Sequence, residues 1–213
     1  MGSIKIWGLE LNWLILIMGA FLEFIVPYIL AIFYPKYSHS REVLSALGGK
    51  DSPVSKYYNL WLIIWGIIMS FTSITFYKAY SEVSNMLAAI GAIAFILFGV
   101  GACILSAMFS VEDRKSIESM EGKIHGIGSG IGFIALAFMP LIISKLAYMK
   151  SESLLGMIFI IFFIINIIIF TLFVMSEKDH FSNTVIGLSG LWQRLLLASF
   201  YMPLVILAIK NIK

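Results

Sequence analysis

The residues best suited to chemistry in this chain lie between positions 109 and 132, where charge, a histidine and several glycines separate two strongly apolar segments. Positions 112–115 are all charged, and His125 follows at the start of the next apolar segment. A carboxylate and an imidazole can exchange protons with a substrate, activate water or hold a metal ion. Asp113 and His125 are therefore the candidate catalytic residues.

Other polar residues come to the same membrane face as this pair once the apolar segments are counted as membrane crossings. They lie in the first long loop, at the start of the second helix, after the third helix and at the start of the last: Ser45, Asp51, Asn59, Glu112, Gln193 and Arg194. Arginine is a good partner for an anionic headgroup. The predicted ligand-binding set is Ser45, Asn59, Asp113, His125 and Arg194.

Three interpretations of this cluster stay open. In a structural network, Asp113 caps a short helix and His125 bonds a loop carbonyl, while Arg194 pairs with Glu112 or Asp113. In a binding site for a lipid or isoprenoid headgroup, Arg194 and Lys123 meet phosphate. The partner could also be another membrane protein. In an intramembrane hydrolase acting on a lipid or isoprenoid, Asp113 and His125 perform the chemistry. The residues leave open whether the protein is an enzyme.

The sequence predicts neither a metal nor a cofactor. Its three histidines are His39, His125 and His180, and two of them lie in loops, whereas catalytic zinc usually takes three protein ligands. The single cysteine, Cys103, lies in an apolar segment, which excludes an internal disulfide and a thiolate cluster. The net charge of +3 is spread over loops, so no basic face is available for nucleic acid.

The composition is that of a membrane protein. Of 213 residues, 60% are hydrophobic and 13% are charged, whereas about a quarter are charged in a soluble domain. A membrane-crossing helix needs about twenty mainly apolar residues. We therefore expect an all-α membrane protein in which residues 1–213 form one integral domain, a six-transmembrane-helix bundle. The predicted helices are about 11–34, 58–77, 86–109, 123–143, 154–175 and 188–209.

One acid lies inside a predicted span. Glu23 falls near the middle of helix 11–34, where an unpaired carboxylate would cost a few kcal/mol. It should face the bundle interior, carry a proton or meet a partner. With His125 it could also line the polar path of a small-molecule transporter, which is a further alternative. No broken helix is expected, because Pro27 and Pro140 lie towards helix ends and only Pro203 lies well inside.

Glycine spacing predicts which helices approach closely. Helix 86–109 contains three glycines, and helix 123–143 carries two overlapping small-xxx-small pairs. These pairs are Gly126 with Gly130 and Gly128 with Gly132. Helix 154–175 is apolar on every side except at Asn166, so it should be the most lipid-exposed.

Six crossings place both termini and the connections 78–85 and 144–153 on one side of the membrane. The three longer loops lie on the other side. Lysine and arginine are similarly dense on both sides, so they decide the orientation only weakly. We expect a multi-pass protein of the cell membrane with cytoplasmic termini.

Several short motifs occur in a characteristic order. They are SALG with a following Pro53 and Tyr58-Asn59, then FSVED, GKIH and GLWQR. Together they resemble the domain-of-unknown-function 998 family, multi-pass membrane proteins of bacteria and archaea. The resemblance implies a six-helix bundle and transfers no activity. The family's characteristic positions map to Ser45, Gly48, Asn59, Asp113, His125 and Arg194, while Ser110 stands where the family often has proline.

Overall fold

All regular structure that the computed structural model describes, over residues 2–109 and 119–212, is helical. Six segments are long and apolar enough to cross a membrane, so the predicted fold class is confirmed. The helices that form them are α1 (Gly2–Ile32), α2 (Ser55–Tyr80), α3 (Asn85–Ile96), the π-helix η2 (Leu97–Leu105), α4 (Ser106–Met108), α5 (Met120–Ala137), α6 (Met139–Met149), α7 (Ser153–Ser176) and α8 (Ser189–Asn211). Three short 3-10 helices lie in the loops: η1 (Leu44–Gly48), η4 (Asp179–Phe181) and η5 (Val185–Gly187).

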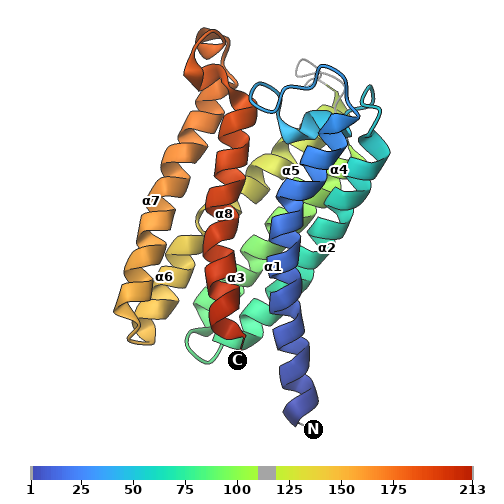
Figure 1. The fold of residues 1–213 in the computed structure, drawn as a ribbon. Helices are drawn as coiled ribbons and strands as arrows, with labels where there is room; N and C mark the ends of the chain where they lie inside the picture. Colours follow the sequence, from blue (N-terminus) through green and yellow to red (C-terminus); the bar gives the residue numbers. More distant parts are fainter. Residues whose placement is uncertain (1, 110–118, 213) are drawn as a thin grey trace.

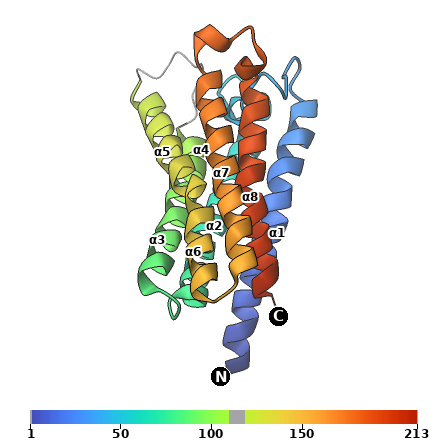
Figure 2. The same ribbon diagram turned by 90° about the vertical axis from the view of Figure 1, so that its left-hand side faces the viewer.

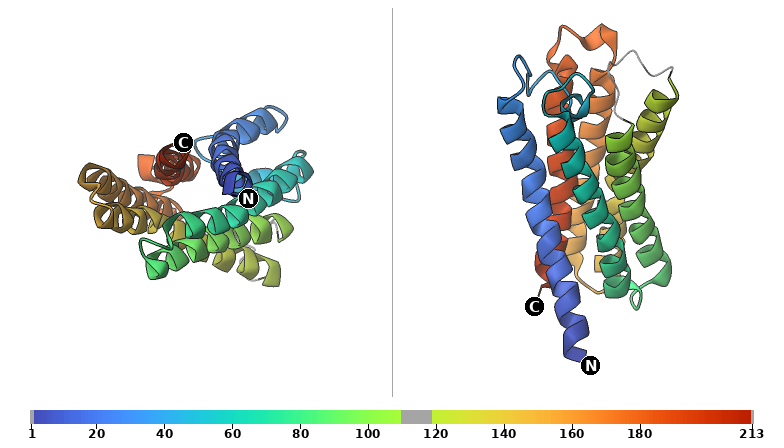
Figure 3. Two further views of the ribbon diagram at one scale, coloured as in Figure 1. Left: turned by 90° about the horizontal axis from the view of Figure 1, so that it is seen from below. Right: turned by 90° about the vertical axis from the view of Figure 1, so that its right-hand side faces the viewer.

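The spans pack as a ring around a shared interior (Figures 1 and 2). Helix α1 packs against α2 and α8, α2 against α3 and η2, η2 against α5, α6 against α7, and α7 against α8. The view along the bundle shows this ring from the end that carries both termini (Figure 3). The first loop and the connection between α7 and α8 lie at the opposite end, here called the loop end (Figure 1).

The fourth span differs from the prediction in length and continuity. It reaches Met149 rather than residue 143, and only residues 150–152 separate it from α7. It is also interrupted at Phe138, which lies between α5 and α6. Pro140, in the first turn of α6, has no N–H to bond the carbonyl four residues earlier, so the regular helix stops before it. The expectation of unbroken helices was therefore wrong.

The third span is irregular as well. Its central nine residues, Leu97–Leu105, form a π-helix, which sequence patterning did not predict. This segment packs on α2 through Gly99, where an added Cβ would overlap the carbonyl oxygen of Gly66. It packs on α5 through Gly101, where an added Cβ would overlap the carbonyl of Gly128. The predicted close approach of this span to its neighbours is thus seen on two sides.

Only one of the two predicted glycine faces of the fourth span is used. An added Cβ at Gly128 would lie 3.0 Å from the Gly101 carbonyl, and one at Gly132 would lie 2.9 Å from the Ala102 Cβ. By contrast, no atom of the described residues lies within 4 Å of that position at Gly126 or Gly130. The pair Gly128 and Gly132 is therefore the packing face.

Aromatic rings fill the interior. The ring of Tyr201 lies 5.4 Å from Trp65, 6.1 Å from Phe24 and 6.2 Å from Phe98, measured between centroids. Helix α7 is the least buried span, since only 11% of its most apolar stretch is buried in the structure. This is expected for the most lipid-exposed helix.

The Asn166 side chain, which has no exposed surface, joins α7 to two neighbours. One end of its amide lies 3.3 Å from the Ala137 carbonyl, where α5 ends. The other end lies 2.9 Å from both the hydroxyl and the carbonyl of Ser199. Pro203 cannot donate to the Ser199 carbonyl, and the break after α5 disturbs the bonding of the Ala137 carbonyl. Asn166 thus meets backbone oxygens where α5 ends and where Pro203 leaves a carbonyl of α8 without its helical donor.

Candidate functional site

Arg194 organises the loop end from the second turn of α8. Its Nη1 donates to the carbonyls of His39 (2.6 Å), Gly190 (2.9 Å) and Glu42 (3.2 Å). Its Nη2 donates to the Tyr37 hydroxyl at 2.8 Å and lies 3.3 Å from His39 Nδ1. Arg194 is only 9% exposed, and its two terminal nitrogens are bonded by protein atoms, whereas its Nε has no hydrogen-bond partner in the described chain.

Further bonds hold the first loop to the start of α8. We call residues 36–48 the first-loop cap. Gln193 Oε1 accepts from the Leu44 amide at 2.5 Å, and the Ser189 hydroxyl donates to the Arg41 carbonyl at 2.8 Å. An added Cβ at Gly190 would overlap the carbonyls of the cap, so glycine is required where α8 meets it. The GLWQR motif is therefore the docking segment for the cap.

Two titratable groups of the cap respond to this arrangement. Burial lowers the pKa of His39, and the nearby Arg194 charge lowers it further. Burial raises the pKa of Tyr37, although Arg194 opposes that shift. The His39 ring stacks on Tyr28, with ring centroids 4.3 Å apart, and meets Tyr37 edge-on at 5.4 Å. Both shifts favour a neutral imidazole and a neutral phenol beside the arginine.

Of the predicted residues, Ser45 belongs to the cap itself and Asn59 lies next to its end, on α2. Ser45 is a half-buried member of η1. Asn59 Nδ2 donates to the Gly48 carbonyl at 3.1 Å and to the Ser55 hydroxyl at 3.3 Å. An added Cβ at Gly48 would overlap Asn59 Oδ1, a buried acceptor that has no hydrogen-bond partner within the described chain. Asn59 thus binds the end of the cap to the start of α2.

His125 belongs to a different cluster. It lies in the second turn of α5, against the backbone of Ser106 and Phe109 at the end of the third span. Its Nδ1 is buried with no hydrogen-bond partner in residues 2–109 and 119–212. Within the described residues, the contacts of His125 and those of Arg194 share no residue, so these two members of the predicted set lie apart.

Asp113 and Glu112 lie outside the described residues. The pairing of Asp113 with His125, and that of Arg194 with either acid, stay predictions. In the described part of the chain, no three histidine, cysteine, aspartate or glutamate side chains are grouped to hold a metal ion.

Glu23 faces the bundle interior, as predicted for an intramembrane acid. It is 3% exposed, and its Oε2 accepts a 2.6 Å hydrogen bond from Trp61 Nε1 on α2. Tyr58, Cys103 and Tyr201 are each close enough to interact electrostatically with its carboxyl group. The acid therefore sits among aromatic and neutral polar groups contributed by several spans.

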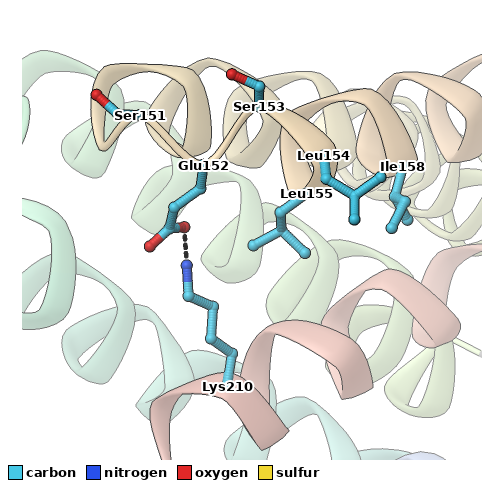
Figure 4. Close-up of a pocket in the computed structure, with 7 residues that line it drawn as sticks. All are labelled: Ser151, Glu152, Ser153, Leu154, Leu155, Ile158 and Lys210. Atoms are coloured by element: carbon cyan, nitrogen blue, oxygen red, sulfur yellow. Dashed lines mark ion pairs between the residues drawn. The ribbon is translucent and has the colours of Figure 1, made fainter.

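A groove lies at the end of the bundle that carries both termini, opposite the loop end. Figure 4 shows the residues that line it. Its volume is about 520 Å³, and it lies between the start of α7 and the end of α8. The residues that line it are Ser151, Glu152, Ser153, Leu154, Leu155, Ile158 and Lys210. Lys210 and Glu152 point toward one another as an ion pair, with the apolar side chains to one side (Figure 4).

Sequence reasoning missed this groove. Lys150 and Lys210 entered only the comparison of lysine and arginine density on the two sides of the membrane. The short connection between α6 and α7 contains no recognisable motif. The one available signal is the sequence Lys150-Ser-Glu-Ser153, four polar residues between two apolar spans.

Comparison with known proteins agrees with the resemblance noted in the sequence. No curated protein and no solved structure matches the chain. A family model matches residues 17–210, which is nearly the whole chain. The chain belongs to the family described as "Protein of unknown function (DUF998)".

Proposed function

We propose that this multi-pass membrane protein binds an anionic phospholipid in the groove between α7 and α8. The observation that carries the proposal is the lining of the groove, which changes from the charged pair of Glu152 and Lys210 to apolar side chains along α7. Phospholipids have the same division, with a charged phosphate next to acyl chains. The ligand class is the one expected from the sequence, but the site lies at the other end of the bundle.

Charge supports an anionic headgroup. Lys210 pairs with Glu152, and Lys150 Nζ lies 4.0 Å from Glu152 Oε1, so two lysines surround one carboxylate. The side chains of Lys150, Glu152 and Lys210 are 39%, 30% and 30% exposed, which leaves them accessible from the membrane surface. The local excess of positive charge favours a headgroup with a net negative charge over a zwitterionic headgroup.

The first turn of α7 adds backbone donors. Glu152 is the residue that caps α7, yet its side chain makes no capping hydrogen bond and turns to Lys210 instead. The leading amides of a helix lack intrahelical partners, and anions bind well there. Ser151 and Ser153 also line the groove, with their hydroxyls pointing away from the pair of Glu152 and Lys210 (Figure 4).

The apolar part of the groove suits an acyl chain. Leu154 is 69% exposed, and Leu155 and Ile158 follow along the same helix. An exposed leucine in a membrane span is solvated by hydrocarbon. A lipid whose phosphate lies at Lys210 would therefore place its chains along these residues.

Native mass spectrometry of the detergent-purified protein tests the proposal by counting retained phosphatidylglycerol and phosphatidylcholine. Lys210→Gln should weaken phosphatidylglycerol binding about fivefold, the equivalent of roughly 1 kcal/mol per lysine. Glu152→Gln should strengthen it, because the competing carboxylate is removed. Both variants break the ion pair, so opposite effects separate charge recognition from loss of local structure.

Lys78→Gln is the matched control, since Lys78 is an exposed lysine at the same end of the bundle but outside the groove. It should leave the ratio of the two lipids unchanged. Equal retention of phosphatidylglycerol by the wild type and Lys210→Gln would overturn the proposal, as would a decrease in both groove variants.

A further inference from the structure

Glu23 is held well inside the membrane-crossing part of α1. It lies nine residues before the helix end at Ile32, which is about 13 Å along the axis at roughly 1.5 Å per residue. The helix packs against α2, α8 and η1, and the Glu23 side chain points into that junction. Its described hydrogen-bond donor is the Trp61 indole, a neutral group.

The titratable groups that face Glu23 are also neutral. Tyr58 comes from α2, Cys103 from η2 and Tyr201 from α8, while η1 contributes none. Arg194 interacts electrostatically with Tyr58, but its hydrogen bonds go to the first-loop cap. A buried carboxylate without a cation is strongly disfavoured within a membrane, whereas the protonated acid is not.

Polar groups continue from Glu23 towards the loop end. Tyr58 lies in the first turn of α2 and interacts electrostatically with both Glu23 and Tyr37. Tyr37 in turn accepts a hydrogen bond from Arg194 and contacts the ring of His39, which is partly exposed. A series of neighbouring polar groups therefore reaches from the bundle interior to the surface of the cap: Glu23, Tyr58, Tyr37 and His39.

The interior on the other side of Glu23 is mainly apolar, although the fully buried Thr75 hydroxyl accepts a 2.8 Å hydrogen bond from Asn12 Nδ2 there. The side chains that fill it towards the termini are fully buried: Trp13, Leu16, Met69, Phe76 and Phe95. The hydroxyls of Thr72 and Ser73 lie at this level, but they bond backbone carbonyls of their own helix. The polar groups on the cap side therefore offer the better route for a proton from Glu23.

We propose that Glu23 is a reversible proton-binding site inside the bundle and that it exchanges its proton with the loop-end surface past Tyr58 and the first-loop cap. On release, the O–H bond of the carboxyl group breaks and the proton passes to water at the cap. The carboxylate left behind keeps the Trp61 N–H as a donor. The site is separate from the lipid groove and does not depend on it.

Infrared difference spectroscopy of the protein in lipid nanodiscs tests the site. At neutral pH the wild type should show the carbonyl band of a protonated carboxylic acid, and Glu23→Gln should lack it. Alkaline pH should remove this band from the wild type, and neutral pH should restore it. Glu10→Gln, on the same helix, is the matched control and should keep the band.

Two further measurements keep the test independent of whether Glu23→Gln folds. A hydrophobic carbodiimide, which reacts with protonated acids in membranes, should label Glu23 of the wild-type protein at neutral pH and much less at alkaline pH. Tyr58→Phe should slow the loss of the infrared band after a jump to alkaline pH at least severalfold, whereas Thr72→Val should not.

Three results would each overturn the proposal: no protonated-acid band from Glu23 at neutral pH, a band that persists unchanged at alkaline pH, or equal exchange rates in Tyr58→Phe and Thr72→Val. Phosphatidylglycerol retention should be the same in Glu23→Gln as in the wild type. Failure of the lipid proposal and failure of the proton site are therefore distinguishable.

Discussion

Arg194 donates a 2.6 Å hydrogen bond to the carbonyl oxygen of His39, a residue 155 positions earlier in the chain. This contact joins the first loop to the last helix, and the same guanidinium group also bonds the Glu42 carbonyl and the Tyr37 hydroxyl. One side chain thus satisfies several backbone acceptors of a loop that has little regular structure of its own. The stability of the first-loop cap should depend on it.

Replacing Arg194 by methionine should destabilise the protein by about 2–3 kcal/mol, because buried carbonyls lose a charged donor. The loss should be local at first, so trypsin should cut the cap at Lys36 and Arg41 faster than in the wild type. Limited proteolysis followed by mass spectrometry measures this. Arg194→Lys should recover only part of the effect, since an ammonium group lacks the planar set of donors.

Lys56→Met is the control for these variants. Lys56 is an exposed cation in the first turn of α2, near the same membrane face. This change should alter neither the thermal midpoint nor the rate of cleavage at the cap. Unchanged cleavage in Arg194→Met would show that the cap is held by other contacts.

Acidification should loosen the cap through His39. Its pKa in the folded protein lies below the ordinary value of 6.5, so the unfolded chain binds the proton more readily. The stability that the neutral ring contributes is present above pH 6.5 and decreases as the pH falls below that value. Protonation would also place an N–H against Arg194, 3.3 Å from His39 Nδ1.

Tryptic cleavage of the cap, compared just above and well below pH 6.5 with the enzyme rate corrected, measures this effect. His39→Gln should abolish the pH dependence, and His180→Gln, in the connection between α7 and α8, should preserve it. A wild-type cap that is equally resistant at both pH values would contradict the assignment to His39.

The sequence was sufficient to predict six spans because each is a long apolar run, and hydropathy is a direct measure of solvation by lipid. It misplaced the end of the fourth span because residues 144–149 contain a serine, a lysine and a tyrosine, which resemble a surface connection. The Ser144 hydroxyl is in fact buried and bonds the Gly156 carbonyl at 2.8 Å. A polar residue whose partner is a backbone atom of another helix cannot be recognised from composition.

The same limit applies to the candidate sites. Arg194 was identified as important, but its acceptors are mainly backbone carbonyls, and these have no signature in a sequence. Glu23 was identified from its position in an apolar run, whereas nothing in the sequence pointed to Trp61 as its partner. The ion pair of Glu152 with Lys210 joins residues from two different helix ends, which are brought together only by the packing of α7 on α8.

Replacing Gly101 by alanine should destabilise the bundle by about 1–3 kcal/mol, because the new Cβ would overlap the Gly128 carbonyl and backbone cannot move aside cheaply. Gly130→Ala is the matched control on the facing helix, where the same Cβ meets nothing within 4 Å. That variant should be neutral or slightly more stable, since alanine favours the helix. Thermal unfolding in one detergent, followed by circular dichroism, compares the two; similar effects would exclude the proposed packing face.

Asn166→Leu should destabilise the protein even though it makes α7 uniformly apolar. Hydropathy alone predicts the opposite, because leucine is the better residue in contact with lipid. The amide, however, is fully buried between the Ala137 carbonyl and Ser199; its NH₂ group can donate to one of these sides, and leucine can donate to neither. Interhelical hydrogen bonds in membranes contribute about 0.6 kcal/mol on average and up to about 1.7, so we expect a loss of roughly 1 kcal/mol.

Thr171→Val on the same helix separates these two effects. The Thr171 hydroxyl is exposed and bonds the carbonyl of Ile167 within α7, so its removal raises hydropathy without breaking a contact between helices. Detergent-resistant thermal midpoints should therefore fall for Asn166→Leu and stay constant or rise for Thr171→Val. If both variants raised the midpoint, solvation by lipid rather than the hydrogen bonds of Asn166 would control the placement of α7.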